Sequence, residues 1–316
     1  MKRPSLFFLL SLISLSCKLL PNSTGNSAEN DPTRTYSLRL NPPVGAKYYY
    51  TVKSQSEVKF EVGDKKIDNL NKTTAGMTYT VGKDTSGNFT IRVQYDKLHV
   101  YTKNGDEVTD IDAANAATST DPVEKMLGSL TNMPLVASVT PTGEVKSIIG
   151  YQDIPDKILT AFAGTDANTR NLMRDRLKQM VGNGIIKNNI SDLFNFFPDS
   201  AVHVKDKWKL NSVQVSELNL NTQNSFTLAK MEDGIATIES EGKISRDSAA
   251  IDLMGYQVIA KLDGDQQAQY EMDAHTGILI SAVLTTSIKG SISLMGQDVP
   301  LSLETTVRIE GTSAVR

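Results

Sequence analysis

Strict alternation of apolar and polar residues over unusually long runs is the feature that most constrains the fold. Every even position from 278 to 294 is apolar or small, and residues 46–62 and 256–272 alternate in the same way. Side chains of a β-strand alternate between the two faces of the sheet, so each run predicts a half-buried strand. Strands usually have 3–10 residues, and sheets twist, so strands of this length predict a strongly curved sheet.

Short turns separate the alternating runs near the C-terminus. The turn at 275–277 ("HTG") precedes the run at 278–294, and the turn at 296–298 ("GQD") precedes a further run at 299–309. Turns this short join strands that are antiparallel neighbours. The sequence therefore predicts a mainly β (α+β) fold, with long, strongly curved antiparallel sheets or a partial barrel.

The middle of the chain changes from a strand period to a helix period. Apolar residues recur at helical spacing in 153–163, 166–181 and 185–197, and 121–132 is typical of a further short helix. These stripes need an apolar surface to cover, which the curved sheet offers. The predicted organisation is an N-terminal β-rich half at 36–150, a helical insert of about three helices at 151–200 and a C-terminal β-meander half at 201–316.

The two β-rich halves resemble each other at three places, in the same order. "AKYYYTV" at 46–52 matches "DKWKLNS" at 206–212, "GNFTI" at 87–91 matches "GIATI" at 234–238, and "TPTGEVKS" at 140–147 matches "DAHTGILI" at 273–280. The likeness has two interpretations, a duplication of one β half or the recurrence of common turn chemistry.

The first sixteen residues have the pattern of a secretory signal. Lys2 and Arg3 precede ten largely apolar residues at 6–15, followed by the small residue Ser16. The run is too short for a transmembrane helix, which needs about 20 apolar residues. Residues 1–16 are therefore predicted to be a signal peptide.

Cys17 is the single cysteine of the chain, so it cannot form an intramolecular disulfide. "SLSC" at 14–17 resembles a bacterial lipoprotein signal, in which the cysteine becomes the lipidated first residue. The usual leucine three positions before the cysteine is Ser14 here, a departure that the looser signals of Bacteroidetes and spirochaetes accommodate. The alternative is an incidental cysteine beside an ordinary signal-peptidase site after Ser16.

We expect Cys17 to be lipidated and residues 17–35, which are rich in polar residues, to form a flexible tether to a membrane. "CKLLPN" at 17–22 lacks the acidic cluster linked with surface export in Bacteroidetes. The expected location is therefore the outer membrane, with the protein facing the periplasm.

Charge argues against nucleic acid as a partner. The chain has 33 basic and 36 acidic residues, a net charge of −3, and loss of Lys2 and Arg3 brings it to −5. No stripe of basic residues is present in the sequence.

The search for catalytic motifs predicts no enzyme. The three histidines, His99, His203 and His275, are far apart, and no metalloprotease, nucleophile-elbow or phosphate-loop motif is present. Asp263 with Asp265 could offer oxygen ligands to calcium, but the spacing of an EF-hand loop is missing. We therefore expect no catalytic residues, no metal and no cofactor.

The overall pattern resembles the uncharacterised secreted lipoproteins of Bacteroidetes. The markers of this resemblance are "PTGEV" at 141–145 and "FPDSAVHVKDKW" at 197–208. The resemblance implies no established activity. At the level of architecture alone, long curved strands with helices on the concave face are similar to periplasmic lipoprotein carriers of the Lol type, although a fold does not decide a function.

The last prediction is a site for a lipid or other apolar ligand between the curved sheet and the helical insert, since ligand sites are mostly apolar hollows. The alternative is a solid core, which would make the protein a structural or protein-interaction module of the cell envelope. The predicted wall residues are Tyr48, Tyr50, Phe60, Phe194, Phe197, Ile280, Leu284, Ile288 and Ile292.

Overall fold

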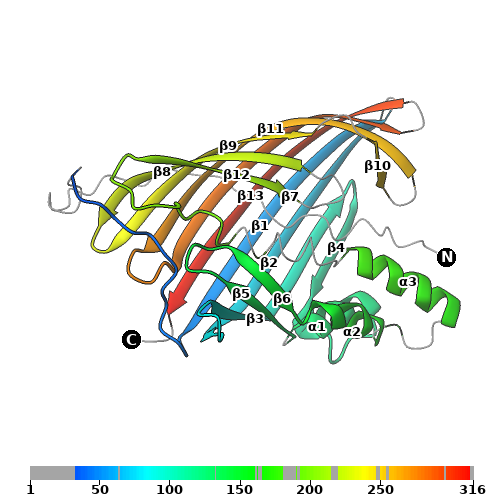
Figure 1. Ribbon diagram of the computed structural model, residues 1–316. Helices are drawn as coiled ribbons and strands as arrows, with labels where there is room; N and C mark the ends of the chain where they lie inside the picture. The colour runs from blue at the N-terminus through cyan, green and yellow to red at the C-terminus, as the bar shows by residue number, and fades with distance from the viewer. Residues whose placement is uncertain are drawn as a thin grey trace.

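The chain forms one large, curved antiparallel sheet (Figure 1). The computed structural model describes residues 33–62, 65–131, 133–160, 162, 166–180, 190, 193–214, 220–246, 250–253, 256–294 and 297–313. Within these ranges the sheet has thirteen strands. The predicted mainly β fold class is confirmed.

The long alternating runs are long strands, as predicted. The four strands concerned have 16 to 18 residues each. They are β1 (Lys47–Val62), β11 (Tyr256–Asp273), β12 (Leu279–Leu294) and β13 (Gln297–Ser313). The remaining strands are β2 (Lys65–Lys83), β3 (Phe89–Asn104), β4 (Glu107–Asp112), β5 (Pro134–Val139), β6 (Val145–Ile149), β7 (Lys207–Gln214), β8 (Leu220–Glu232), β9 (Ile235–Arg246) and β10 (Ala250–Leu253).

The order of strands in the sheet repeats itself. The path runs β6-β5-β3-β2-β1-β13-β12-β11-β9-β8-β7, with β4 paired to β3 and β10 paired to β11. A shift of six strand numbers converts the order β6-β5-β3-β2-β1 into β12-β11-β9-β8-β7. The thirteenth strand, β13, lies between the two sets. This repeated order is the arrangement that a duplication of one β half predicts.

The two Thr-Gly turns also match in structure. Gly143 and Gly277 both adopt left-handed backbone angles, with φ of 83° and 68°. After each turn the register shifts by one residue, at Lys146 between β5 and β6 and at Ile280 between β11 and β12. Lys146 and Ile280 both lie three residues after the turn glycine, so the likeness extends to the same β-bulge in the same place.

Three helices lie at one edge of the sheet, beside β3 and β4 (Figure 1). They are α1 (Pro122–Leu130), α2 (Ile154–Thr160) and α3 (Ala167–Met180). Asp121 caps α1 by accepting a hydrogen bond from the Val123 amide at 2.7 Å. The predicted helix at 185–197 lies largely outside the described residues, and its described end at 193–196 forms a turn.

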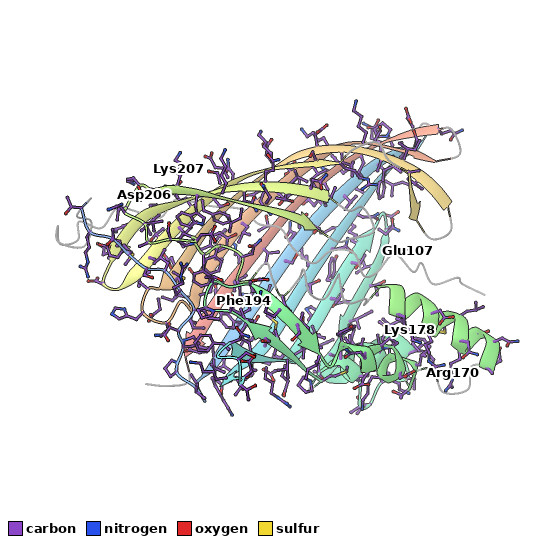
Figure 2. The ribbon with its side chains drawn as sticks, in the orientation of Figure 1. Glu107, Arg170, Lys178, Phe194, Asp206 and Lys207 are labelled. Atoms are coloured by element: carbon purple, nitrogen blue, oxygen red, sulfur yellow. The ribbon has the colours of Figure 1, made fainter. Side chains whose placement is uncertain are left out.

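The helices cover only part of the sheet. Ile154 and Ile158 of α2 are buried in the same apolar cluster as residues of the strands. Leu172 of α3 is 70% exposed, and Figure 2 shows Lys178 on a helix that extends away from the strands. In the described part of the chain, the segment at 193–206, which begins with the turn at 193–196, crosses the open side of the sheet (Figures 1 and 2).

Two extended segments close one end of the sheet. The first segment is residues 36–41 and the second is residues 193–206. They pair through reciprocal hydrogen bonds between Tyr36 and Val202. The same residues contact both Thr-Gly turns, since Leu40 donates to the Pro141 carbonyl and Asn41 donates to the Thr276 carbonyl. One short segment thus holds the corresponding turns of both halves together.

Candidate ligand site on the inner face of the sheet

The face that carries Tyr50 and Tyr270 packs against the closing segments and is called the inner face. Along the strands it divides into three zones. An apolar near cluster lies at the closed end, an apolar far cluster lies at the opposite end, and polar residues lie between the two.

Aromatic rings fill the near cluster. Phe196 stacks on Phe197 and on Tyr270, with ring centroids 4.6 and 5.2 Å apart. The indole of Trp208 stacks on Phe226 at 5.8 Å and donates a hydrogen bond of 3.1 Å to the Phe196 carbonyl. The backbone of the closing segment is therefore tied to the aromatic side chains of the sheet.

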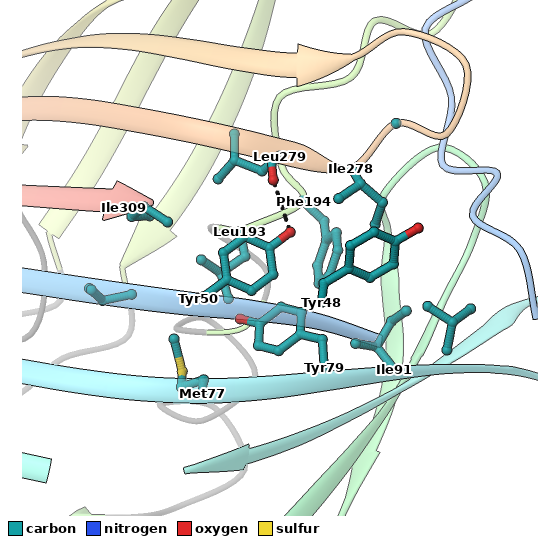
Figure 3. Close-up of a pocket in the computed structure, with 13 residues that line it drawn as sticks. Tyr48, Tyr50, Met77, Tyr79, Ile91, Leu193, Phe194, Ile278, Leu279 and Ile309 are labelled. Atoms are coloured by element: carbon teal, nitrogen blue, oxygen red, sulfur yellow. Dashed lines mark hydrogen bonds between the residues drawn. The ribbon is translucent and has the colours of Figure 1, made fainter. Parts of the chain in front are cut away.

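A second aromatic group of the near cluster surrounds Tyr50 and Tyr79 (Figure 3). The rings of Tyr50 and Tyr79 are 4.6 Å apart, and the Tyr50 hydroxyl donates to the Leu279 carbonyl at 3.0 Å. Burial raises the pKa of both phenols, with a smaller contribution from neighbouring tyrosines.

The near cluster has little free space. The cavity that Tyr48, Tyr50, Phe194 and their neighbours line has a volume of about 20 Å³. That is close to the space that one water molecule needs, whereas ligand pockets commonly have roughly 300–1,000 Å³. The closed end is a packed core.

Polar residues form a row across the middle of the inner face. Each member is the direct register partner of the next on the neighbouring strand, so the row follows the hydrogen-bonding direction of the sheet. In strand order β2-β1-β13-β12-β11-β9-β8 the members are Asn71, Ser56, Thr305, Thr286, Gln266, Gly242 and Asn224. These seven residues are called the polar row.

Only some of the polar side chains in and beside the row form hydrogen bonds with other described residues. Gln266 Nε2 donates to Thr286 Oγ1 at 3.3 Å, and Thr102 Oγ1 donates to Asn71 Oδ1 at 2.9 Å. Four buried oxygens on the same face have no partner among the described residues. They are Ser54 Oγ, Asn69 Oδ1, Thr222 Oγ1 and Asn224 Oδ1.

None of the seven members of the polar row is charged. Arg246 of β9 lies on the same face at the far cluster, as the register partner of Leu262, four residues along the strand from Gly242. Along β1, β11, β12 and β13 the inward positions are apolar or neutral polar residues throughout the described ranges. On the outer face, Lys243 forms an ion pair with Asp265. Hydrogen bonding to that carboxylate raises the pKa of Lys243.

The far cluster lies on the other side of the polar row. Its buried members are Leu220, Ile244, Ala260, Leu262, Ile288 and Leu301, and the half-buried Val58, Phe60, Ile292 and Leu303 pack against them. At Gly290, with φ of 157°, a Cβ atom would overlap the Lys261 carbonyl oxygen on β11. Gly290 is thus a place where two strands approach too closely for a side chain.

The predicted wall residues fall into both clusters. Phe60, Ile288 and Ile292 belong to the far cluster. Ile280 is half-buried and is the bulge residue of β12. The near cluster takes Tyr48, Tyr50, Phe194, Phe197 and Leu284. The structure therefore separates residues that the sequence placed on one wall, and the polar row between them was not recognised as a feature.

A shallow polar groove of about 440 Å³ crosses β7, β8, β9 and β11. Lys209, Glu241, Lys243 and Asp265 are exposed along it, on the outer face. The alternation of the strands predicts these charges on the outer face, but the groove between them has no direct signal in the sequence.

Two of the histidines pair with aspartates at the surface of the protein. His99 lies 2.5 Å from Asp110, and His203 lies 3.0 Å from Asp206, and all four side chains are exposed. Across the described ranges there is no cluster of three His, Cys, Asp or Glu residues that could hold a metal. Cys17 lies outside the described residues.

Helices within the described ranges are too short or too polar to cross a bilayer.

Comparison with known proteins gives a family but no activity. No curated protein matches the chain. Among solved structures, the crystal structure of Pseudomonas aeruginosa OccK7 (OpdD) is 7% identical, covers 85% of this chain and 100% of that one, and has a TM-score of 0.23. This likeness carries no conclusion about the chain. The family of unknown function DUF6263 matches residues 86–279, more than half of the sequence, and the chain belongs to that family.

Proposed function

We propose that the protein is an exported lipoprotein that binds a lipid or another apolar ligand on the inner face of its sheet and catalyses no reaction. In this proposal Cys17 carries the lipid anchor, residues 17–35 are the tether, and the protein faces the periplasm from the outer membrane. The signal-like first sixteen residues, the single cysteine and the resemblance to secreted lipoproteins of Bacteroidetes support the anchor.

The far cluster is the observation that carries the ligand proposal. Ten apolar residues gather there, on a face that the described closing segments cover only at the opposite end. The described helices pack beside β3 and β4 and not on the far cluster. A cluster of buried and half-buried apolar residues on the concave face of a sheet, against which neither the described helices nor the described closing segments pack, supports a site for an apolar ligand.

The far cluster can be tested with a matched pair of variants on β12. The protein is purified from its native membranes, extracted with organic solvent and analysed by mass spectrometry. We expect near-stoichiometric lipid with the wild-type protein and with Ser291→Lys, which adds a charge on the opposite side of the strand. Ile292→Lys adds the same charge to the half-buried edge of the far cluster and is expected to remove the lipid, because a charge that a hydrocarbon chain shields from water is costly.

A structural or interaction module of the cell envelope is the second candidate. The cavity of about 20 Å³ in the near cluster favours it, since that part of the protein is filled by its own side chains. Absence of lipid from the wild-type extract, together with no binding of apolar fluorescent probes, would decide for this candidate.

The anchor has its own experiment. Cells supplied with an alkyne fatty acid should label the wild-type chain and not Cys17→Ser, and the variant should leave the membrane fraction. Equal labelling of the two chains, or labelling of neither, would contradict lipidation at Cys17.

A further inference from the structure

Buried, unpartnered hydroxyls lie beside the polar row. Thr222 is 2% exposed and Ser54 is 6% exposed, and neither side-chain oxygen has a hydrogen-bond partner among the described residues. Each lies two residues along its strand from a member of the row, Asn224 or Ser56, and therefore on the same face. Leaving a buried hydroxyl unpaired costs about 1–3 kcal/mol, so such groups normally have a partner.

We propose that the polar row is the subsite for the uncharged, hydrogen-bonding group of an amphiphilic lipid whose hydrocarbon chain lies on the far cluster. This inference rests on the proposed function and adds the chemical class of the ligand. The row borders the far cluster directly, because Thr286 and Ile288 are successive inward residues of β12.

The unpartnered oxygens of the row and of the residues beside it decide which polar group of a ligand fits. The hydroxyls of Ser54 and Thr222 can donate or accept, and the amide oxygens of Asn69 and Asn224 accept. A complementary ligand must therefore carry hydroxyl or amide donors.

The row itself decides against an ionised group at this position. None of its members is charged, and Arg246 on the same face lies four residues along β9 from Gly242, about 13 Å away at about 3.3 Å per residue. No inward position on the described parts of β1, β11, β12 or β13 carries a cation that could pair with a phosphate or carboxylate. An isolated buried ion is far more costly than a buried hydroxyl that forms hydrogen bonds. A glycerol or amide group fits this surface, and a phospholipid headgroup does not.

The distance along the strand suits one hydrocarbon chain. From Thr286 to Ile292 is six residues, or about 20 Å at about 3.4 Å per residue. Half of a bilayer hydrocarbon core is about 15 Å thick. One acyl chain of ordinary membrane length can lie along the far cluster while its polar end reaches the row.

Three probes with similar hydrocarbon chains and different polar ends test the proposal. Monooleoylglycerol has uncharged hydroxyls, oleate at pH 8 has a charge, and 1-octadecene has no polar group. Each is delivered from cyclodextrin to the full chain carrying Cys17→Ser, and binding is measured by displacement of an apolar fluorophore. We expect monooleoylglycerol to bind about tenfold more tightly than 1-octadecene, as two modest hydrogen bonds would give, and oleate to bind more weakly than monooleoylglycerol.

The double variant Ser54→Ala/Thr222→Val should abolish the tenfold preference and leave 1-octadecene binding unchanged. Thr227→Val, on the outer face of β8, is the matched control and should retain the preference. If the double variant does not fold, Thr222→Val alone should reduce the preference about threefold.

The outcomes separate this inference from the proposed function. Equal binding of all three probes with no effect of the variants means that the row binds only water, which overturns the inference and leaves an apolar site. Tightest binding of oleate also overturns it. Failure of every probe to bind overturns the proposed function itself.

Discussion

Two isosteric substitutions near and within the polar row are expected to change stability in opposite directions. Thr222→Val replaces a buried hydroxyl that has no partner among the described residues. Thr286→Val replaces a buried hydroxyl that accepts a hydrogen bond from Gln266 at 3.3 Å. Both remove one oxygen from the inner face and preserve the shape of the side chain.

The size of each change in the free energy of unfolding follows from whether the hydroxyl has a hydrogen-bond partner. An unsatisfied buried hydroxyl costs about 1–3 kcal/mol, so Thr222→Val should raise the free energy of unfolding by about 1–2 kcal/mol. Thr286→Val loses a hydrogen bond and leaves the Gln266 amide without an acceptor, so it should lower that free energy by about 1–3 kcal/mol. Thr285→Val, on the outer face of the same strand, should change it by less than about 0.5 kcal/mol.

Urea unfolding of the ligand-free protein measures these differences. With a slope of about 3 kcal/mol per molar urea, Thr222→Val should raise the midpoint by roughly 0.3–0.7 M, and Thr286→Val should lower it by up to about 1 M. A loss of stability in Thr222→Val would show that the hydroxyl has a partner in solution, and the reasoning about the polar row would be refuted.

Three further predictions concern the near cluster. Phe196→Ala should lower the free energy of unfolding by about 3–5 kcal/mol, because it removes a buried ring that stacks on Tyr270; a loss below about 1 kcal/mol in a urea titration would contradict the packed closed end. Gly311→Ala places a Cβ 2.6 Å from Tyr50 Cε1 and should cost about 1–3 kcal/mol by the same measurement. Burial raises the pKa of Tyr50 and Tyr79 above the ordinary value of 10.0, so the stability that they contribute is fully present below pH 10 and is lost as the pH rises further. Thermal unfolding between pH 8 and pH 12 should show this loss, and Tyr50→Phe should reduce its slope.

The period of the strands made the sheet predictable. The positions of the helices were not predictable from the sequence. A period of two over sixteen residues has one structural solution, so β1 and β12 agree with the predicted runs to within a residue. An amphipathic pattern predicts that a helix has an apolar side, but it does not predict which part of the protein packs against that side. The helices α1 and α2 satisfy their stripes against each other and against the edge of the sheet, so the sequence could not locate them.

The sequence predicts which residues share the inner face of the sheet. It does not predict which of these residues lie next to each other on neighbouring strands. The small polar residues Ser54 and Ser56 were visible as gaps in an apolar alternation. Their meaning depends on register, since Ser56 becomes part of a row only because it pairs with Thr305 and Asn71. Pairing between residues about 250 positions apart has no local signal, so the row required the structure.

Pairing in the sheet also bears on how much of the chain forms one folding unit. The family match at 86–279 contains β3 to β11 and omits β1, β2, β13 and nearly all of β12. The omitted strands are the ones that join β3 to β11 in the sheet. Without them, the matched residues fall into two sheets with unpaired edges and exposed inner faces, which is a typical cause of aggregation.

A fragment of residues 86–279 should therefore fail to fold as a monomer, whereas residues 33–313 should unfold in one cooperative transition. Size-exclusion chromatography and urea unfolding monitored by circular dichroism distinguish the two chains. The fragment loses the pairing of β3 with β2 along Lys83–Asn69 and of β11 with β12 along Val258–Met272. A monomeric fragment with a sharp transition would show that each half folds alone. In that case β13 would join two independent domains, and the polar row, which crosses β13 at Thr305, would form only after the two halves had assembled.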